Sequence, residues 1–371
     1  MVADETVEGK VGQCSHGISK FYSGSAGKAI KGVCFFGVSL VDTFSRTSFF
    51  LGVQQVVYSD ADKARIAESK SKKVERTSKK DASIILARGR KKGTKNKEII
   101  ENPTASYRVF KLLFNTVIDS LTVICPQINI SYLVLDSAYG TFDYQAIANS
   151  KNIPIISKLK SITALYLPWI NNADQPKSKG RPRIYGQKLS MNALPNQYLQ
   201  QTEIDEEYKT ETYQLKAYAK NTFGQKLLNI VIQRKVRLSD GKVATNIWMS
   251  TNLHLLSTTL LDYYSLRFQI EFDFRDAKQY FGLSDFKNYK QENLTNFANL
   301  SFTMCLISKI QLAHYRKKLN APNLSIIDLK LIYKARFTAK NIFKLVQKNP
   351  NTIFNEQFCE QFIPQDLINA A

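Results

Sequence analysis

The sequence predicts an α/β protein with a mixed sheet flanked by helices, and three patterns support this fold class. Residues 27–58 are rich in Val, Phe and Leu around a polar Asp-Thr-Phe-Ser-Arg run, which is typical of two strands joined by a turn. Residues 132–156 read as strand, helix and strand, an order that implies parallel pairing. Residues 161–250 hold short alternating segments, which predict a β-rich, antiparallel insertion in the α/β domain.

The segments around these patterns complete the expected order of elements. Residues 106–124 follow a proline and repeat apolar residues at helical spacing, so they predict a helix. Residues 60–102 are dense in Lys and Arg with few large apolar side chains, and we expect a solvated basic loop there. A helix from about residue 257 and a long amphipathic helix over 293–316 follow. The predicted parts are the first part of the α/β domain, the β-rich insertion, the last part of that domain and a helical tail, at 1–160, 161–250, 251–318 and 319–371.

The charge of the chain indicates a polyanionic partner. The 371 residues are enough for a sizeable core, and 44% hydrophobic with 11% aromatic residues are globular values. Lys and Arg number 52 against 31 Asp and Glu, a formal charge of +21. So large an excess favours nucleic acid first and an anionic membrane second.

Cysteine and histidine usage excludes several classes of site. The five cysteines and three histidines are scattered without a Cys-x-x-Cys pair, which argues against a structural zinc site or a disulfide framework and fits a reducing cytosol. No apolar run reaches the ~18 residues that span a bilayer. The first ten residues are acidic and polar, unlike a signal peptide.

Residues 263–278, YYSLRFQIEFDFRDAK, predict one uninterrupted helix with two stripes. Apolar side chains at helical spacing form a core stripe, namely Tyr263, Leu266, Ile270, Phe274, Ala277 and Phe281. Beside it, four polar side chains fall within a sector of about 60°, namely Tyr264, Arg267, Glu271 and Lys278. Such charges commonly form only a surface ladder worth a few tenths of a kcal/mol. Asp136 favours a functional site, because it ends a strand where α/β folds place their ligands.

The spacing Tyr-x2-Arg-x3-Glu-x6-Lys resembles the YREK signature of bacterial insertion-sequence transposases of the insertion-sequence-four group, within the DDE superfamily. VLDSAYG resembles the segment around the second acid of that family, KLKSITALY and SKGRPRIYG resemble stretches that follow it, and GRKKGTKNK resembles a basic run of related transposases. The similarity covers roughly residues 1–310. It implies a ribonuclease-H-like fold with the β-rich insertion between the second and third catalytic acids.

The resemblance also implies the site. Asp4, Asp136 and Glu271 would be the catalytic acids and the ligands of two Mg²⁺ ions, with Mn²⁺ as a substitute. Tyr264, Arg267 and Lys278 would contact phosphates near the cleaved DNA end. The first acid has an alternative, Asp42, but that residue lies in the predicted hairpin turn, where turn chemistry alone explains an Asp; Asp4 is therefore preferred.

Further DNA contacts are expected from basic and aromatic residues. Arg88, Arg90 and Arg181 lie in short Gly-Arg runs that resemble minor-groove hooks. Trp169 and Trp248 border the predicted insertion, where a flipped base would stack, although core packing is the expected role of both.

The predicted function is that of a DNA transposase that cleaves and joins the ends of an insertion-sequence element. The expected partners are double-stranded DNA of the element's ends and target, and a second copy of the chain on that DNA. The expected location is the bacterial cytoplasm, at the nucleoid, with no membrane partner. Only three residues precede Asp4, so the family's N-terminal DNA-binding domain is expected to be missing. The alternatives are an inactive DNA-binding remnant and a metal-dependent nuclease without strand transfer.

Overall fold

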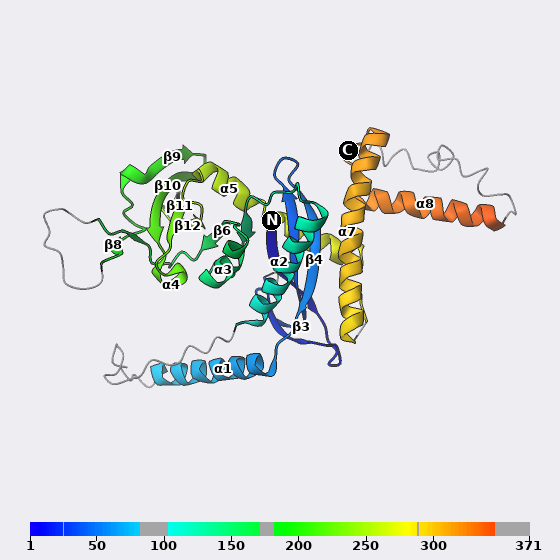
Figure 1. Cartoon of the computed structure of the whole chain (residues 1–371), viewed down its shortest axis with the longest axis horizontal. Coiled ribbons are helices and arrows are strands. Elements are labelled where there is room, and N and C mark those ends of the chain that lie inside the picture. Colours follow the sequence, from blue (N-terminus) through cyan, green and yellow to red (C-terminus); the bar gives the residue numbers. More distant parts are fainter. Residues whose placement is uncertain (25, 82–102, 171–181, 288, 346–371) are drawn as a thin grey trace. The chain divides into compact units, whose positions relative to one another are not determined.

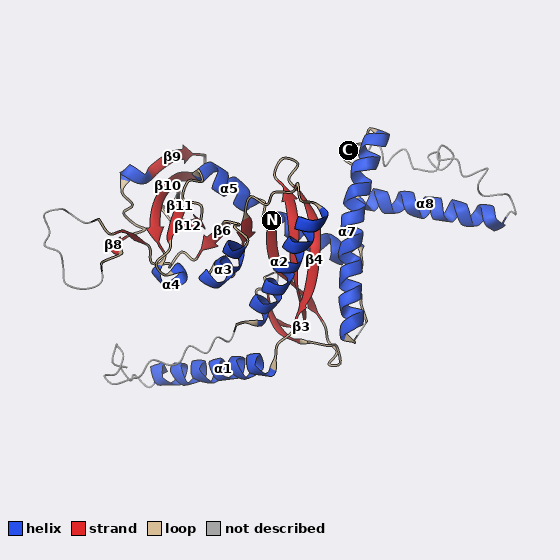
Figure 2. Cartoon of the chain, in the orientation of Figure 1, coloured by secondary structure: helices blue, strands red, loops and turns tan. Residues whose placement is uncertain are grey.

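The computed structural model describes residues 1–24, 26–81, 103–170, 182–287 and 289–345, with backbone only for 72–81 and 342–345. The chain divides into two compact units, residues 1–270 and residues 271–371. Figures 1 and 2 show the elements of both units, and each unit is described by itself below.

The sheet of the first unit is built around β1 (Val2–Gly9). β1 pairs antiparallel with β3 (Lys28–Asp42) and parallel with β5 (Leu133–Leu135). β4 (Thr47–Val56) adds to the outside of β3, and β6 (Ile155–Leu159) pairs parallel with β5. The order β4-β3-β1-β5-β6, with three parallel strands after a hairpin, is consistent with the predicted ribonuclease-H-like fold.

The hairpin predicted over residues 27–58 is confirmed by the antiparallel β3–β4 pair, and the short β2 (Ser19–Ser23) also pairs with β3. Asp42 lies at its turn. One carboxylate oxygen of Asp42 accepts the Phe44 N–H at 3.1 Å and the other accepts the Ser45 N–H at 3.1 Å. These bonds close the turn from within and account for an aspartate at this position.

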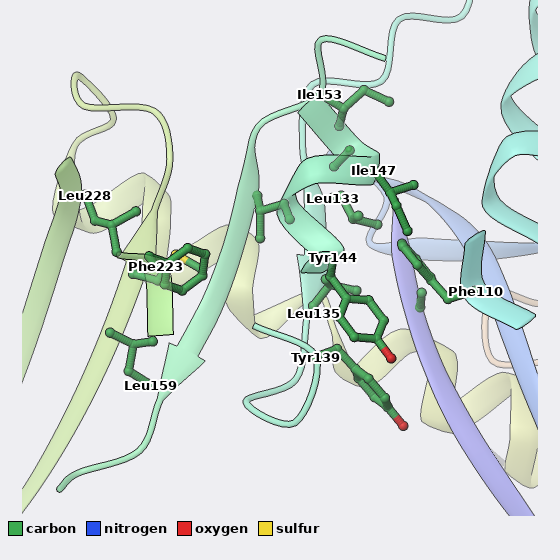
Figure 3. Packing of buried hydrophobic residues seen from close by; sticks show 14 of the residues in the cluster. Phe110, Leu133, Leu135, Tyr139, Tyr144, Ile147, Ile153, Leu159, Phe223 and Leu228 are labelled. Atoms are coloured by element: carbon green, nitrogen blue, oxygen red, sulfur yellow. The ribbon is translucent and has the colours of Figure 1, made fainter. Parts of the chain in front are cut away.

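Two helices that the sequence predicts cover one face of this sheet. α2 (Ala105–Ile124) is capped by Thr104, whose side chain accepts the Tyr107 N–H. α3 (Phe142–Ser150) connects β5 to β6. Figure 3 shows Phe110 of α2 and Tyr144 of α3 packed near Leu135 of β5 in one buried cluster. Apolar residues at helical spacing on α2 pack against alternating apolar residues of the strands. The core therefore lies between a layer of helices and the sheet.

The described residues between 166 and 250 add six strands to the same sheet. These are β7 (Tyr166–Pro168), β8 (Tyr185–Lys188), β9 (Leu199–Ile204), β10 (Tyr208–Tyr218), β11 (Leu227–Arg237) and β12 (Val243–Ser250), with a short 3-10 turn η1 (Asn196–Tyr198) and a short helix α4 (Lys220–Phe223) between them. They pair antiparallel, and β12 joins them to β6. The domain boundaries that the sequence suggests stay a prediction.

The loop predicted over residues 60–102 is wrong for its first half, which forms α1 (Asp60–Asp81). Ser59 and Asp62 start this helix: the Ser59 hydroxyl and N–H donate to the Asp62 carboxylate, and the Asp62 N–H donates to the Ser59 hydroxyl. Lys, Arg, Glu and Ala are strong helix formers, so scarcity of large apolar residues does not imply a loop. Residues 82–102 lie outside the described residues.

Asp62 joins α1 to α2 and makes this junction sensitive to pH. Its side chain is 1% exposed and accepts hydrogen bonds from Arg65 and Arg108. Burial alone would raise the pKa of Asp62, but the bonds from Arg108 and Ser59 outweigh it and lower the pKa to about 2. A carboxyl whose pKa is lower in the folded than in the unfolded state stabilises the fold above the unfolded value. That stability is lost as the pH falls from about 4 toward 2.

We therefore expect Asp62→Asn to reduce the free energy of unfolding by about 2 kcal/mol at neutral pH and to flatten its decline between about pH 4 and 2. Urea unfolding across this pH range measures both effects. Asp60→Asn is the matched control, because the Asp60 side chain is 99% exposed and its one ion pair among the described residues is with Lys63 of its own turn. An equal decline in the free energy of unfolding of the two variants between about pH 4 and 2 would contradict the role of Asp62.

The single helix predicted over residues 263–278 is interrupted, whereas four members of its predicted apolar stripe, Leu266, Ile270, Phe274 and Ala277, are buried as expected. α5 (Ser257–Ser265) ends and α6 (Phe268–Tyr280) begins on either side of a turn. There the Leu266 N–H donates to the Tyr263 carbonyl and the Arg267 N–H to the Tyr264 carbonyl, a spacing of three residues instead of four. One helical wheel therefore does not relate Arg267 to Glu271. The turn places Arg267 against Asp4 of β1, a contact between distant residues that helical periodicity does not reveal.

The second unit is helical. α7 (Gln291–Leu319) confirms the long helix predicted over 293–316, and α8 (Ile326–Leu345) follows it. Leu312 and Tyr315 of α7 pack with Leu329 and Ile332 of α8 in a small core. Within the described part of the chain, no helix combines the length and the apolar character that crossing a membrane requires.

Candidate active site

Two of the predicted acids lie side by side on parallel strands. β1 and β5 pair Ala3 with Leu135, and one residue further along each strand places Asp4 beside Asp136. Ala3 and Leu135 belong to the buried cluster under the helices. Because side chains alternate between the two faces of a sheet, Asp4 and Asp136 project from the opposite face, on strands ~4.8 Å apart. The fold therefore puts two carboxylates next to each other.

The backbone at Asp136 is fixed by a tight turn. Its carbonyl oxygen accepts the N–H groups of Tyr139 at 3.0 Å and Gly140 at 3.1 Å. The Ser157 hydroxyl of β6 donates to the same oxygen at 3.2 Å. These three hydrogen bonds fix the backbone at the end of β5. They involve the carbonyl oxygen of Asp136 and not its carboxylate, which lies at the sheet surface.

Arg267 binds the other acid. Its guanidinium donates to one carboxylate oxygen of Asp4 at 2.8 Å, and the N–H of Glu5 donates to the second oxygen at 2.8 Å. The two side chains are only 10% and 18% exposed, so this ion pair is largely shielded from water. A shielded guanidinium favours the ionised form of a neighbouring carboxylate.

A cleft of about 650 Å³ opens on this face of the first unit. The side chains that matter for chemistry in its wall are Asp136, Lys158, Trp248, Tyr264 and Arg267. Burial raises the pKa of Tyr264 to about 12, and the charges of Asp136 and Asp4 oppose its ionisation further, whereas Arg267 acts in the other direction. Tyr264 therefore keeps its proton at neutral pH and can donate a hydrogen bond to an anion in the cleft.

The structure thus brings four of the predicted site residues together in the first unit: Asp4, Asp136, Tyr264 and Arg267. Glu271 is the first residue of the second unit and is exposed, and Lys278 is half-buried later on α6.

The remaining predicted DNA contacts are placed as follows. Arg88, Arg90 and Arg181 lie outside the described residues. Trp248 is 8% exposed, in agreement with the core packing expected of it. Trp169 is half-buried, with the Arg183 guanidinium 5.1 Å from its ring centroid.

The donor chemistry of the acid pair fits a hard divalent cation. Carboxylate oxygens are the ligands that Mg²⁺ and Mn²⁺ prefer, and two adjacent carboxylates repel each other unless a cation lies between or beside them. Among the described residues, no three His, Cys, Asp or Glu side chains gather as a metal-binding group. Asp4 and Asp136 therefore form a pair of carboxylates in the first unit whose donor chemistry suits such a cation.

Sequence reasoning missed Lys158, which lines the cleft next to Asp136. A signal for it exists in the alternation of β6: Ser157 and Leu159 are buried, so Lys158 between them must face the other side of the sheet. The neighbouring strands were not deducible from that alternation.

Comparison with known proteins adds one match. A family model described as DDE superfamily endonuclease matches residues 1–222. The matched range contains Asp4, Asp136 and Lys158 and ends before Tyr264. No curated protein matches the chain.

Proposed function

The chain belongs to the DDE superfamily endonucleases, and from this premise we propose that it cuts the DNA ends of an insertion-sequence element and joins them to a new site. Endonuclease-type action on DNA with divalent metal ions follows from the family. The observation that carries the proposal to this site is the carboxylate pair of Asp4 and Asp136 on adjacent parallel strands, beside a cleft with Tyr264 and Arg267 in its wall.

In this proposal Asp4, Asp136 and Glu271 hold the metal, with two Mg²⁺ ions, or Mn²⁺ in their place. Bound there, such ions activate the attacking oxygen and stabilise the leaving oxygen of a phosphodiester. Glu271 rests on the resemblance to the YREK signature and on its exposure on α6.

The cations and the phenol of the site bind the DNA backbone. The planar guanidinium of Arg267 suits a phosphate. Tyr264 stays protonated and donates a hydrogen bond through its O–H group. Lys278, Arg88, Arg90 and Arg181 are proposed as further backbone contacts, and the formal charge of +21 supports such a partner. We also propose that two copies act together on DNA, in the bacterial cytoplasm at the nucleoid.

Incubation of the purified chain with supercoiled plasmid tests this function. We expect nicking in Mg²⁺ or Mn²⁺, none in EDTA, and 3′-hydroxyl ends on the product. A labelled duplex from the DNA that flanks the reading frame serves as the donor for strand transfer. Its covalent attachment to plasmid supports a transposase.

Two other results would each indicate an alternative function. Nicking without attachment of the donor indicates a nuclease without strand transfer, which the match to an endonuclease family also favours. Retention of DNA in a gel-shift assay with no nicking in either metal indicates an inactive DNA-binding remnant and contradicts the proposal.

A further inference from the structure

Lys158 lies in the same cross-strand row as the two acids. β5 and β6 pair Leu135 with Ser157, so one residue further along each strand places Asp136 beside Lys158. On its other side, Lys158 is paired in register with Trp248 of β12. Across four strands the row therefore reads carboxylate, carboxylate, ammonium and indole, all projecting from the cleft face of the sheet.

The contacts of Lys158 leave its charge available to a ligand. Its ammonium lies 5.7 Å from the centroid of the Trp248 ring, and it makes no ion pair within the described part of the chain. Lys158 lines the cleft together with Asp136. The four-carbon stem lets the ammonium swing while the strand holds the Cα in place.

The order of the row places the acids between two cations. Arg267 binds Asp4 at one end, and Lys158 follows Asp136 at the other. A DNA strand that crosses the carboxylates would meet a positive charge on both sides of the cut. Without such cations, the phosphates that flank the cut would be repelled by the acids.

We propose that Lys158 binds the DNA phosphate on the Asp136 side of the cleaved bond and leaves the Trp248 ring when it does so. A phosphate is the stronger partner, because a charge-assisted hydrogen bond exceeds a cation–π contact. This substrate-binding role rests on the proposed function, in which DNA is cut at Asp4 and Asp136.

Lys160 is a matched control for this assignment. It lies two residues further along the chain, directly after the end of β6, and it also lines the cleft. The register places it beside Asn246, one row away from the acids. The two lysines therefore share their charge and the cleft that they line, and differ in their place relative to the carboxylates.

Plasmid nicking in Mn²⁺ separates the two lysines. We expect Lys158→Gln to lower kcat about 10- to 100-fold with a small change in KM. Without Lys158, the phosphate next to the cleaved bond is no longer held, and the cleaved phosphate loses its position. Lys160→Gln should weaken DNA binding without this loss of turnover. Each variant should reduce the slope of log Kd against log salt concentration by about 1, as expected for one lost phosphate contact.

Tryptophan emission provides a readout that does not depend on cleavage. Trp169→Phe leaves Trp248 as the only tryptophan, because the chain has 2. In Ca²⁺, addition of a short duplex of random sequence should change the Trp248 emission as the ammonium leaves the ring. This change should disappear in Lys158→Gln and persist in Lys160→Gln, with folding of each variant checked by circular dichroism.

The outcomes distinguish this inference from the proposed function. Equal turnover of the two lysine variants, or an unchanged emission response in Lys158→Gln, means that Lys158 only adds to the general positive charge, and overturns the inference. If the unsubstituted chain does not nick DNA at all, the proposed function fails, and the emission response still decides whether Lys158 contacts DNA.

Discussion

Asp136→Asn is expected to reduce metal-dependent cleavage about 10³-fold or more while leaving the fold intact. The Asp136 side chain has no hydrogen bond or ion pair within the described part of the chain, and its backbone is held by the turn that ends β5. Replacing the carboxylate with an amide removes a proposed metal ligand and also removes the repulsion from Asp4. The free energy of unfolding should therefore stay the same or rise slightly, which urea unfolding would show.

Asp4→Asn should abolish cleavage as well, but with a loss of stability. Arg267 is 10% exposed and would lose its ionised partner. Removing the ionised partner from a largely buried pair weakens the compensation of the remaining charge, and we expect a cost of about 2 kcal/mol. The contrast between Asp4→Asn and Asp136→Asn therefore separates the metal-binding role of each acid from its structural role.

Glu271→Gln provides the companion test for the third acid. Glu271 is exposed, so the substitution should not change stability. Nicking should fall to the level of the EDTA control, with DNA retention in a gel-shift assay unchanged. If Asp136→Asn keeps full activity, the carboxylate pair is not the catalytic site; if only Glu271→Gln does, another residue is the third ligand.

Gly140→Ala is expected to damage both stability and cleavage. A Cβ atom at this position would lie 2.2 Å from the Ser157 hydroxyl oxygen and 2.8 Å from its Cβ. Atoms cannot approach so closely, so the turn after β5 must move away from β6 and carry Asp136 with it. We expect a loss of about 1–3 kcal/mol in the free energy of unfolding, typical of overpacking. Cleavage should fall about 10²-fold, because small displacements of catalytic groups have large effects on rate.

The controls for Gly140→Ala use the same measurements, thermal unfolding and plasmid nicking. Gly12→Ala is the matched substitution, since a Cβ there meets no atom within 4 Å, and it should be close to neutral. Adding Ser157→Ala to Gly140→Ala removes the nearer of the two clashing atoms and leaves the other, so it should restore part of the loss. Full activity of Gly140→Ala would show that Asp136 does not depend on this turn.

Much of the fold could be predicted because its signals are local. The hairpin over 27–58 and the helix over 106–124 follow from periodicity within each segment. The strand that ends at Asp136 was recognisable for the same reason. α1 was missed because its favourable residues are charged rather than apolar. The break at Leu266 was missed because it accompanies a contact with Asp4, far away in the sequence.

The candidate site was predictable in its residue types but not in its arrangement. The resemblance named Asp4 and Asp136, yet their adjacency depends on the register between β1 and β5, which tertiary pairing sets. Likewise, the face of Lys158 follows from alternation on β6, whereas its neighbours Asp136 and Trp248 come from two other strands. Periodicity gives the face of a residue, and only pairing gives its neighbours.

The row of Asp4, Asp136, Lys158 and Trp248 has a consequence for how such a protein can change over evolution. Each of these side chains faces the cleft because side chains alternate between the two faces of the sheet along a strand. Deleting one residue inside β5 would turn Asp136 toward the helix-covered core and bring Leu135 to the cleft. A substitution in one of these strands alters one side chain, but a change in the length of a strand turns every side chain that follows in that strand to the other face. Length variation should therefore accumulate in the connecting loops, while the strands keep their residue count.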